Sequence, residues 1–139
     1  MDGVVKYIEF QRENASSNER THFNFILELK ETSEFIGVAG YSYVEDCIYE
    51  LEYFACEKHW NKGYMTEAVK RIFEFARLHK EKVKTIYAIC QTENKSSERV
   101  MIKCGMKKSI EQPKPKKYHG IYKERVKYEI NVFGGLPCF

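Results

Sequence analysis

The sequence predicts a single α/β domain, and three observations support this. The chain has 139 residues, the usual size of one domain, which leaves no room for a second independent core. Its first third is rich in short β-like segments separated by polar turns. Its middle holds a strongly amphipathic helical segment that is followed by a β-α-β passage. The expected element order is therefore β-rich, then βαβαβ, then β.

Composition and charge exclude several classes of protein. With 43% hydrophobic and 31% charged residues, the chain is neither intrinsically disordered nor collagen-like. The net charge of +3 is too mild to imply nucleic-acid binding. No apolar run approaches the roughly 18 residues of a membrane span, and the first residues lack the pattern of a signal peptide, so we expect a cytoplasmic protein without a membrane partner. The five cysteines form no close pair, which indicates reduced thiols and no metal site.

The first four strands are expected at residues 4–10, 23–29, 35–43 and 48–55. A polar loop or poorly specified helix over 11–21 separates the first two, and 30–34 suits an antiparallel hairpin. Gly37 and Gly40 indicate a bulge or a close backbone approach. Alternation in the fourth strand places Glu50 and Glu52 on one face, so two carboxylates lie side by side.

The remaining elements follow from periodicity and capping. A helix is expected over 66–78, because Ala68, Val69, Ile72, Phe73 and Ala76 form an apolar stripe. Basic residues near its end, which are Arg77, His79 and Lys80, suit the helix dipole. A buried strand at 85–90 leads to a short helix that Ser96 or Ser97 caps and Gly105 ends in the left-handed conformation. A strand at 106–111, a basic proline-containing loop at 112–120 and a last strand at 121–132 complete the chain.

The most informative segment is the turn through Gly63 into the 66–78 helix. The first turn of a helix carries unpaired amides and a partial positive charge, and a glycine lets the backbone approach a ligand closely. A phosphate or pyrophosphate therefore fits this turn, and Lys62 adds a mobile positive charge beside it. Taken alone, the turn is more typical of a strand-to-helix junction that binds nothing, and it lacks the spacing of the NTPase phosphate loop.

Residues 59–68, HWNKGYMTEA, resemble the acetyl-CoA pyrophosphate motif of the GNAT acyltransferase superfamily, in the YWGKGYATEA form of the ribosomal-protein N-acetyltransferase (RimJ/RimL) branch. Residues 94–106, NKSSERVMIKCGM, are similar to that branch's NxxSxxVLEKLGF signature. Residues 50–55, ELEYFA, occupy the place of its EIGYWL strand. The similarity runs from about residue 23 to residue 130.

The resemblance implies an α/β (α+β) GNAT-type fold, with a mixed, mostly antiparallel sheet flanked by helices. It also implies acetyl transfer from acetyl-CoA to a primary amine by direct attack. The coenzyme would lie between two strands that splay apart after Tyr53. The backbone amides of the 61–66 turn and Lys62 would hold the pyrophosphate, and the pantetheine arm would follow the strand end. The cofactor residues that the resemblance implies are Phe54, Ala55, Cys56, Asn61, Lys62, Gly63, Tyr64, Met65, Thr66, Asn94 and Ser97.

The departures from the family pattern keep a second function open. Family members begin with a further strand and helix ahead of the 4–10 run, so we expect residues 1–139 to form one GNAT-like domain that lacks these elements. The chain could then be a catalytically impaired acyl-CoA-binding or assembly module with an incomplete acceptor site. Met101 stands where many members carry a tyrosine that acts as general acid, a change that the RimJ/RimL branch shares.

Glu50 is the first candidate for the general base, because it matches the carboxylate position of the family strand. Glu52 lies on the same face, where like charge could raise the pKa of one of the two, and Glu52 or a water relay stays an alternative base. Both carboxylates could instead decorate a solvated face. Ser97 would lie near the departing thiolate and donate a proton or hydrogen bond, or it could simply cap its helix.

Other residues carry less weight as catalytic groups. His59 and His119 lie in loops, where a lone histidine is more often a surface or packing residue. Cysteine nucleophiles are not expected, because no histidine has a diagnostic spacing to them.

The partners expected are acetyl-CoA and an amine acceptor, which is either a protein N-terminus or a small molecule. The basic segment 114–118 could steer an acidic acceptor or nucleic acid, but we expect a solvated loop there. Pairing of an edge strand could make a homodimer.

Overall fold

The computed structural model describes residues 13–16, 20–78 and 83–132. The strand expected at 4–10, the helix-end residues His79 and Lys80, and Cys138 lie outside the described residues. Of the polar segment 11–21, residues 13–16 are helical, and the side chain of Asn14 binds the backbone amides of Thr21 and His22.

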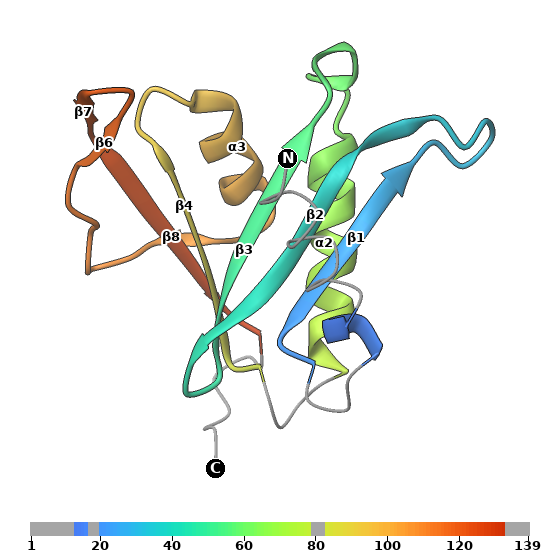
Figure 1. Cartoon of the computed structure of the whole chain (residues 1–139), viewed down its shortest axis with the longest axis horizontal. Helices are drawn as coiled ribbons and strands as arrows, with labels where there is room; N and C mark the ends of the chain where they lie inside the picture. Colours follow the sequence, from blue (N-terminus) through green and yellow to red (C-terminus); the bar gives the residue numbers. More distant parts are fainter. Residues whose placement is uncertain (1–12, 17–19, 79–82, 133–139) are drawn as a thin grey trace.

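A six-stranded sheet forms the frame of the molecule (Figure 1). Its order is β1-β2-β3-β4-β8-β5, and the pair β3–β4 is parallel while every other pair in it is antiparallel. The predicted mixed, mostly antiparallel sheet is thus confirmed. The strands are β1 His22–Glu28, β2 Phe35–Glu45, β3 Ile48–Ala55, β4 Thr85–Gln91, β5 Lys107–Lys108 and β8 Arg125–Asn131.

The sheet opens between its two parallel strands. β3 and β4 pair only as far as Glu50 and Tyr87, and beyond that point the rest of each strand pairs only with its antiparallel neighbour. Figure 1 shows the two halves of the sheet separating from there, with α3 beside the opening. The splay expected after Tyr53 therefore begins three residues earlier, because each strand follows its own twisted partner once the short parallel ladder ends.

Two helices cover one face of this sheet. α2 (Tyr64–Arg77) and α3 (Lys95–Lys103) share a core with the strands, and α2 begins two residues earlier than the sequence predicts. Val69 and Ile72 of α2 and Met101 of α3 are buried with alternate residues of β3 and β4, which are Tyr49, Leu51, Ile86 and Ala88. Because strand residues alternate, Glu50, Glu52 and Tyr87 lie on the opposite face. No helix among the described residues is long and apolar enough to cross a membrane.

Close backbone contacts explain the glycines of β2. A Cβ built on Gly37 would lie 2.0 Å from the carbonyl oxygen of Phe54, and one on Gly40 would lie 2.3 Å from that of Phe23. The close approach predicted at both positions is therefore confirmed. The bulge lies next to Gly37, where the register between β1 and β2 shifts at Leu27 and Glu28.

The ends of α3 correct one prediction and confirm another. The N-cap is Asn94, whose side-chain oxygen accepts from the Ser97 amide at 3.1 Å, and neither Ser96 nor Ser97 caps the helix. Asn94 takes this position because its oxygen reaches the amide three residues on, as cap residues do. Gly105 ends the helix at φ 86°, where Met106 N donates to Met101 O, as predicted.

The last third of the chain differs from the sequence prediction. The strand expected at 106–111 shortens to β5. Beyond β5, the side-chain amide of Gln112 donates to the Lys127 carbonyl and accepts from the Lys127 amide, so a side chain occupies the place of a backbone partner for β8. Residues expected in a loop form β6 (Lys116–Tyr118), which pairs with β7 (Ile121–Lys123). The turn between them, His119-Gly120, has two left-handed residues, as a tight hairpin requires. The strand expected at 121–132 is accordingly interrupted at Glu124.

Candidate functional site

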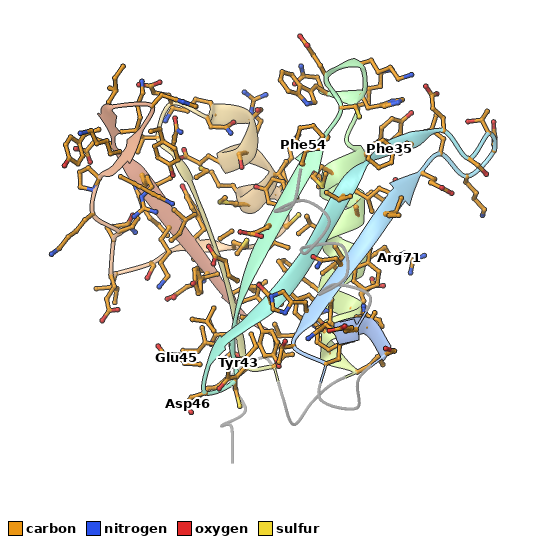
Figure 2. The ribbon with its side chains drawn as sticks, viewed as in Figure 1. Phe35, Tyr43, Glu45, Asp46, Phe54 and Arg71 are labelled. Carbon is orange, nitrogen blue, oxygen red and sulfur yellow. The ribbon has the colours of Figure 1, made fainter. Side chains whose placement is uncertain are left out.

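A cavity of about 450 Å³ lies at the open end of the sheet, between the end of β3, the turn into α2 and the exposed side of α3. Figure 2 shows Phe54 at this end of β3, whereas Tyr43, Glu45 and Asp46 lie at the opposite end, near the β2–β3 turn. The sequence-predicted residues that line the cavity are Phe54, Ala55, Asn61, Gly63, Tyr64, Met65, Thr66, Asn94 and Ser97. Lys62 is exposed beside it, and neither Lys62 nor Cys56 is part of its lining.

The cavity also contains residues that the sequence analysis missed. Arg99 and Lys103 of α3 bring two positive charges to its wall, next to Ser96 and Val100. The available signal is the four-residue spacing of Arg99 and Lys103, because it places them on one side of a helix. Tyr53, His59 and Trp60 complete the lining.

A larger hollow of about 740 Å³ lies between β1 and α2. Only Tyr64, among the predicted site residues, borders it, and apolar side chains such as Phe25, Leu27 and Phe75 dominate its wall. Size alone therefore does not identify the site. The smaller cavity brings together the predicted turn, strand end and helix start, and we treat it as the candidate active site.

The turn into α2 presents backbone donors to this cavity. Asn61 and Gly63 both have left-handed backbone angles, φ 60° and φ 79°. The first intrahelical bond of α2 runs from Glu67 N to Gly63 O, so the amides of residues 64–66 precede it, and no described side chain caps them. A Cβ at Gly63 would meet nothing within 4 Å, which shows that this side of the turn is open. The arrangement suits an anion.

The segment before the turn is held in place by packing and charge. It forms a short 3-10 helix, η1 (Glu57–His59), in which Lys58 pairs with Glu34 of the β1–β2 turn and lowers the pKa of that carboxyl group. His59 is only 6% exposed, and its ring lies 5.9 Å from that of Tyr64. The Trp60 indole donates to the carbonyl of Ala55 at 2.7 Å. Of the two roles expected for His59, a surface residue or a packing residue, its burial agrees with the second.

Tyr53 connects the two sides of the opening. Its hydroxyl lies 2.8 Å from both the backbone oxygen and the hydroxyl of Ser97, 44 residues away in sequence. Burial raises the pKa of Tyr53, so its phenol stays protonated. Because Asn94 supplies the helix cap, the Ser97 hydroxyl is not needed for that purpose.

Glu50 lies where β3 and β4 separate, on the face away from α2 and α3. It is half-buried, and burial raises the pKa of its carboxyl group, with a further rise from the charge of Glu52. A hydrogen bond with Tyr87 and the positive charges of Arg125 and Lys116 oppose this rise. Glu52 itself is exposed. The structure thus shows the shared face that the alternation predicts, and the two carboxylates have different surroundings.

The cysteines of the core are not suited to nucleophilic chemistry. Cys90 and Cys104 are buried, and burial raises the pKa of both thiols, which disfavours the reactive thiolate. Both belong to the hydrophobic core, in line with the expectation that no cysteine acts as a nucleophile. His119 is exposed in the β6–β7 turn, where it adopts φ 48°.

Comparisons with known proteins bear on this site. A family model described as an acetyltransferase (GNAT) domain matches residues 2–107, more than half of the chain. A Bacillus subtilis (strain 168) protein named uncharacterized N-acetyltransferase YnaD is 34% identical over 118 residues, which cover 76% of this chain and 66% of that protein. The chain thus spans slightly less than two-thirds of the length of this relative.

Solved structures share the fold. The ribosomal-protein-S5-alanine acetyltransferase from Vibrio fischeri aligns with a TM-score of 0.76 and 18% identity, over 98% of this chain and 72% of that one. Spermidine N-acetyltransferase from Vibrio cholerae, solved with CoA and spermine, aligns with a TM-score of 0.74 and 17% identity, over 91% and 73%. The family match, together with a splayed sheet and an uncapped helix start at its opening, shows that the chain belongs to the GNAT acetyltransferase family.

Proposed function

We propose that the chain transfers an acetyl group from acetyl-CoA to a primary amine by direct attack. The single observation that carries this proposal is the turn at residues 61–63, which presents the free amides of α2 at the open end of the sheet. The match to the GNAT domain and the CoA in the structure of the spermidine N-acetyltransferase support it.

In this proposal the coenzyme lies in the 450 Å³ cavity. The amides of residues 61–66 hold the pyrophosphate, and Lys62, Arg99 and Lys103 add positive charge around it. The pantetheine arm follows the part of β3 that β4 leaves unpaired, residues 51–55, and approaches Cys56. The oxygen of Asn94 is engaged in the helix cap, and its amide nitrogen donates to the arm.

Glu50 accepts the proton of the amine, directly or through water. An aliphatic amine with a pKa of about 10 is mostly protonated at neutral pH and must lose a proton before it attacks. The raised pKa of Glu50 makes this carboxylate a better base than an ordinary surface glutamate. Ser97, oriented by Tyr53, hydrogen-bonds the departing thiolate.

Two classes of acceptor fit this proposal. The relatives include an enzyme named for a ribosomal protein and one named for spermidine, so both a protein N-terminus and a small amine are candidate acceptors. The motifs at residues 59–68 and 94–106 favour the RimJ/RimL branch.

Binding and turnover test the proposal separately. We expect Lys62→Glu to weaken acetyl-CoA binding about tenfold, measured by calorimetry, because it places a negative charge beside the pyrophosphate. Arg71→Ala is the matched control, because Arg71 lies on α2 but borders the other hollow (Figure 2). Unchanged acetyl-CoA affinity in the Lys62→Glu variant would show that Lys62 does not contribute to the binding site.

For turnover, thiol release is followed with acetyl-CoA and a panel of amines. We expect Glu50→Gln to lower kcat by about 100-fold with little change in acetyl-CoA affinity, the effect of losing a general base.

The Glu50→Gln variant should also unfold at a higher temperature than the wild type at neutral pH, measured by thermal denaturation. A raised pKa means that the folded state favours protonated Glu50, so the ionised group destabilises the fold above its pKa.

A matching Ser97→Ala variant tests the thiolate role. It should lower kcat while it leaves the fold intact, because Asn94 keeps the helix cap. Saturable acetyl-CoA binding without thiol release from any amine would instead support the acyl-CoA-binding module.

A further inference from the structure

On the sheet face that carries Glu50, the carboxylates of β3 lie across the opening from two cations of β8. Glu50 and Glu52 lie on β3, on one side of the opening. Arg125 and Lys127 lie on β8, on the other side, opposite Gln91 and Ile89 of β4. Residues opposite one another in these ladders share a face, so both sets of charges face the same way as Tyr87, which pairs with Glu50.

Tyr87 marks the boundary between the two sets. The ammonium of Lys127 lies 4.4 Å from the centre of the Tyr87 ring, while the Tyr87 hydroxyl bonds Glu50. Among the described residues no ion pair joins the β3 carboxylates to these cations. A further carboxylate of this face, Glu129, lies opposite both Tyr87 and Lys107.

The β6–β7 hairpin adds another cation to the basic side. Lys116 and Tyr118 share one face of β6, with the ammonium 5.5 Å from the ring, and the charge of Lys116 acts on Glu50. Lys117 lies on the other face of the hairpin, 5.7 Å from the ring of Tyr122. Arg125 is fixed beside this hairpin because its guanidinium donates two hydrogen bonds to the carbonyl of Lys114, at 2.9 and 3.1 Å.

We propose that the acceptor is an amine that also carries a carboxylate, with its nitrogen directed to Glu50 and its anionic group to Lys116, Arg125 and Lys127. A dipolar face of this kind attracts an acceptor whose charges have the opposite arrangement. A polyamine would place additional positive charge next to these three cations, so it is the disfavoured acceptor. This inference rests on the proposed function and adds the acceptor class to it.

The test compares acceptors that differ only in charge. Thiol release is measured with Ala-Asp-amide, Ala-Asn-amide and Ala-Lys-amide, which share one α-amine, and with spermidine. Glutamate α-amide and glutamine α-amide form a second pair, which distinguishes a small amine from a peptide as the source of the carboxylate. We expect the aspartate peptide or glutamate α-amide to exceed its neutral partner about fivefold in kcat/KM, the size of one partly exposed ionic contact.

Two hairpin variants provide the structural control. Lys116→Glu should abolish the preference for the anionic acceptor, and Lys117→Glu, on the same strand but the opposite face, should keep it. The inference on the acceptor would be overturned by equal rates for the anionic and neutral acceptors, or by an equal effect of the two variants on the acceptor preference. In either case thiol release itself would still support the proposed function. No thiol release with any acceptor would overturn both.

Discussion

The ionisation of Glu50 depends on neighbours from several parts of the chain. Burial is the largest influence on its pKa and raises it, and Glu52 raises it further. Tyr87, Arg125 and Lys116 act in the opposite direction. A base in this setting is deprotonated only above a raised pKa, so the activity that we propose should rise with pH through that value.

Removal of Glu52 tests this electrostatic arrangement. In Glu52→Gln the like charge is lost and the pKa of Glu50 falls, so the acidic limb of the kcat/KM profile should move to lower pH. Glu45→Gln is the control, because Glu45 acts on Tyr87 but is not among the charges that shift Glu50. A limb that stays in place in the Glu52 variant, or moves equally in both, would exclude Glu50 as the titrating base. The measurement is a pH profile at limiting acceptor concentration.

At the scale of single elements, α2 depends on the turn that precedes it. Gly63 is its N-cap in the left-handed conformation, and the side of the turn where a Cβ would lie is open. The helix amides can face a ligand because no described side chain occupies the cap. The same glycine thus provides both the backbone angle and the open approach that an anion needs.

A pair of alanine substitutions separates strain from ligand contact. Gly63→Ala and Gly120→Ala should each lower the free energy of unfolding by about 1–2 kcal/mol, because both residues have φ near 80° with nothing nearby to clash. Only Gly63→Ala should weaken acetyl-CoA binding, because Gly120 lies in the β6–β7 turn and does not line the cavity. Urea denaturation and calorimetry measure the two effects. Equal loss of affinity in both variants would argue against the turn as the ligand contact.

At the scale of the whole molecule, the cavity depends on how closely β2 and β3 approach each other. Gly37 lies against the carbonyl of Phe54, near the end of β3 that borders the cavity. The contact involves backbone atoms on both sides, so neither strand can yield by rotating a side chain. The position of β3, and with it the opening of the sheet, is therefore tied to the packing of the entire sheet.

Gly37→Ala should accordingly affect both stability and binding. Its Cβ would approach Phe54 O to 2.0 Å, and we expect a loss of roughly 1–3 kcal/mol of stability, as for overpacked cores, together with weaker acetyl-CoA binding. Val38→Ala, at the next position but exposed, should change stability by less than about 0.5 kcal/mol. Thermal denaturation of both variants checks this expectation. A Gly37 variant as stable as the wild type would show that the strands separate easily.

Much of the architecture could be predicted because its causes are local. The apolar stripe of α2, the alternation of β3, the turn at Gly63 and the left-handed Gly105 each depend on a few adjacent residues, and the structure has them where the sequence predicts. The prediction of the α3 cap was wrong because three polar residues within four positions, Asn94, Ser96 and Ser97, compete for that role, and the sequence does not show which side chain reaches the amide. The β6–β7 hairpin was missed because prolines and lysines precede its short strands.

The sequence by itself determined β1 to β4 and α2 to within a few residues, and it singled out the turn at Gly63 as the candidate anion site. Only the tertiary structure decided where the sheet opens, that Tyr53 meets Ser97 across 44 residues, and which charges surround Glu50. The physical reason is the range of the interactions. Backbone angles and helical periodicity act over a few neighbouring residues, whereas burial and electrostatic fields sum over groups that chain folding alone brings together.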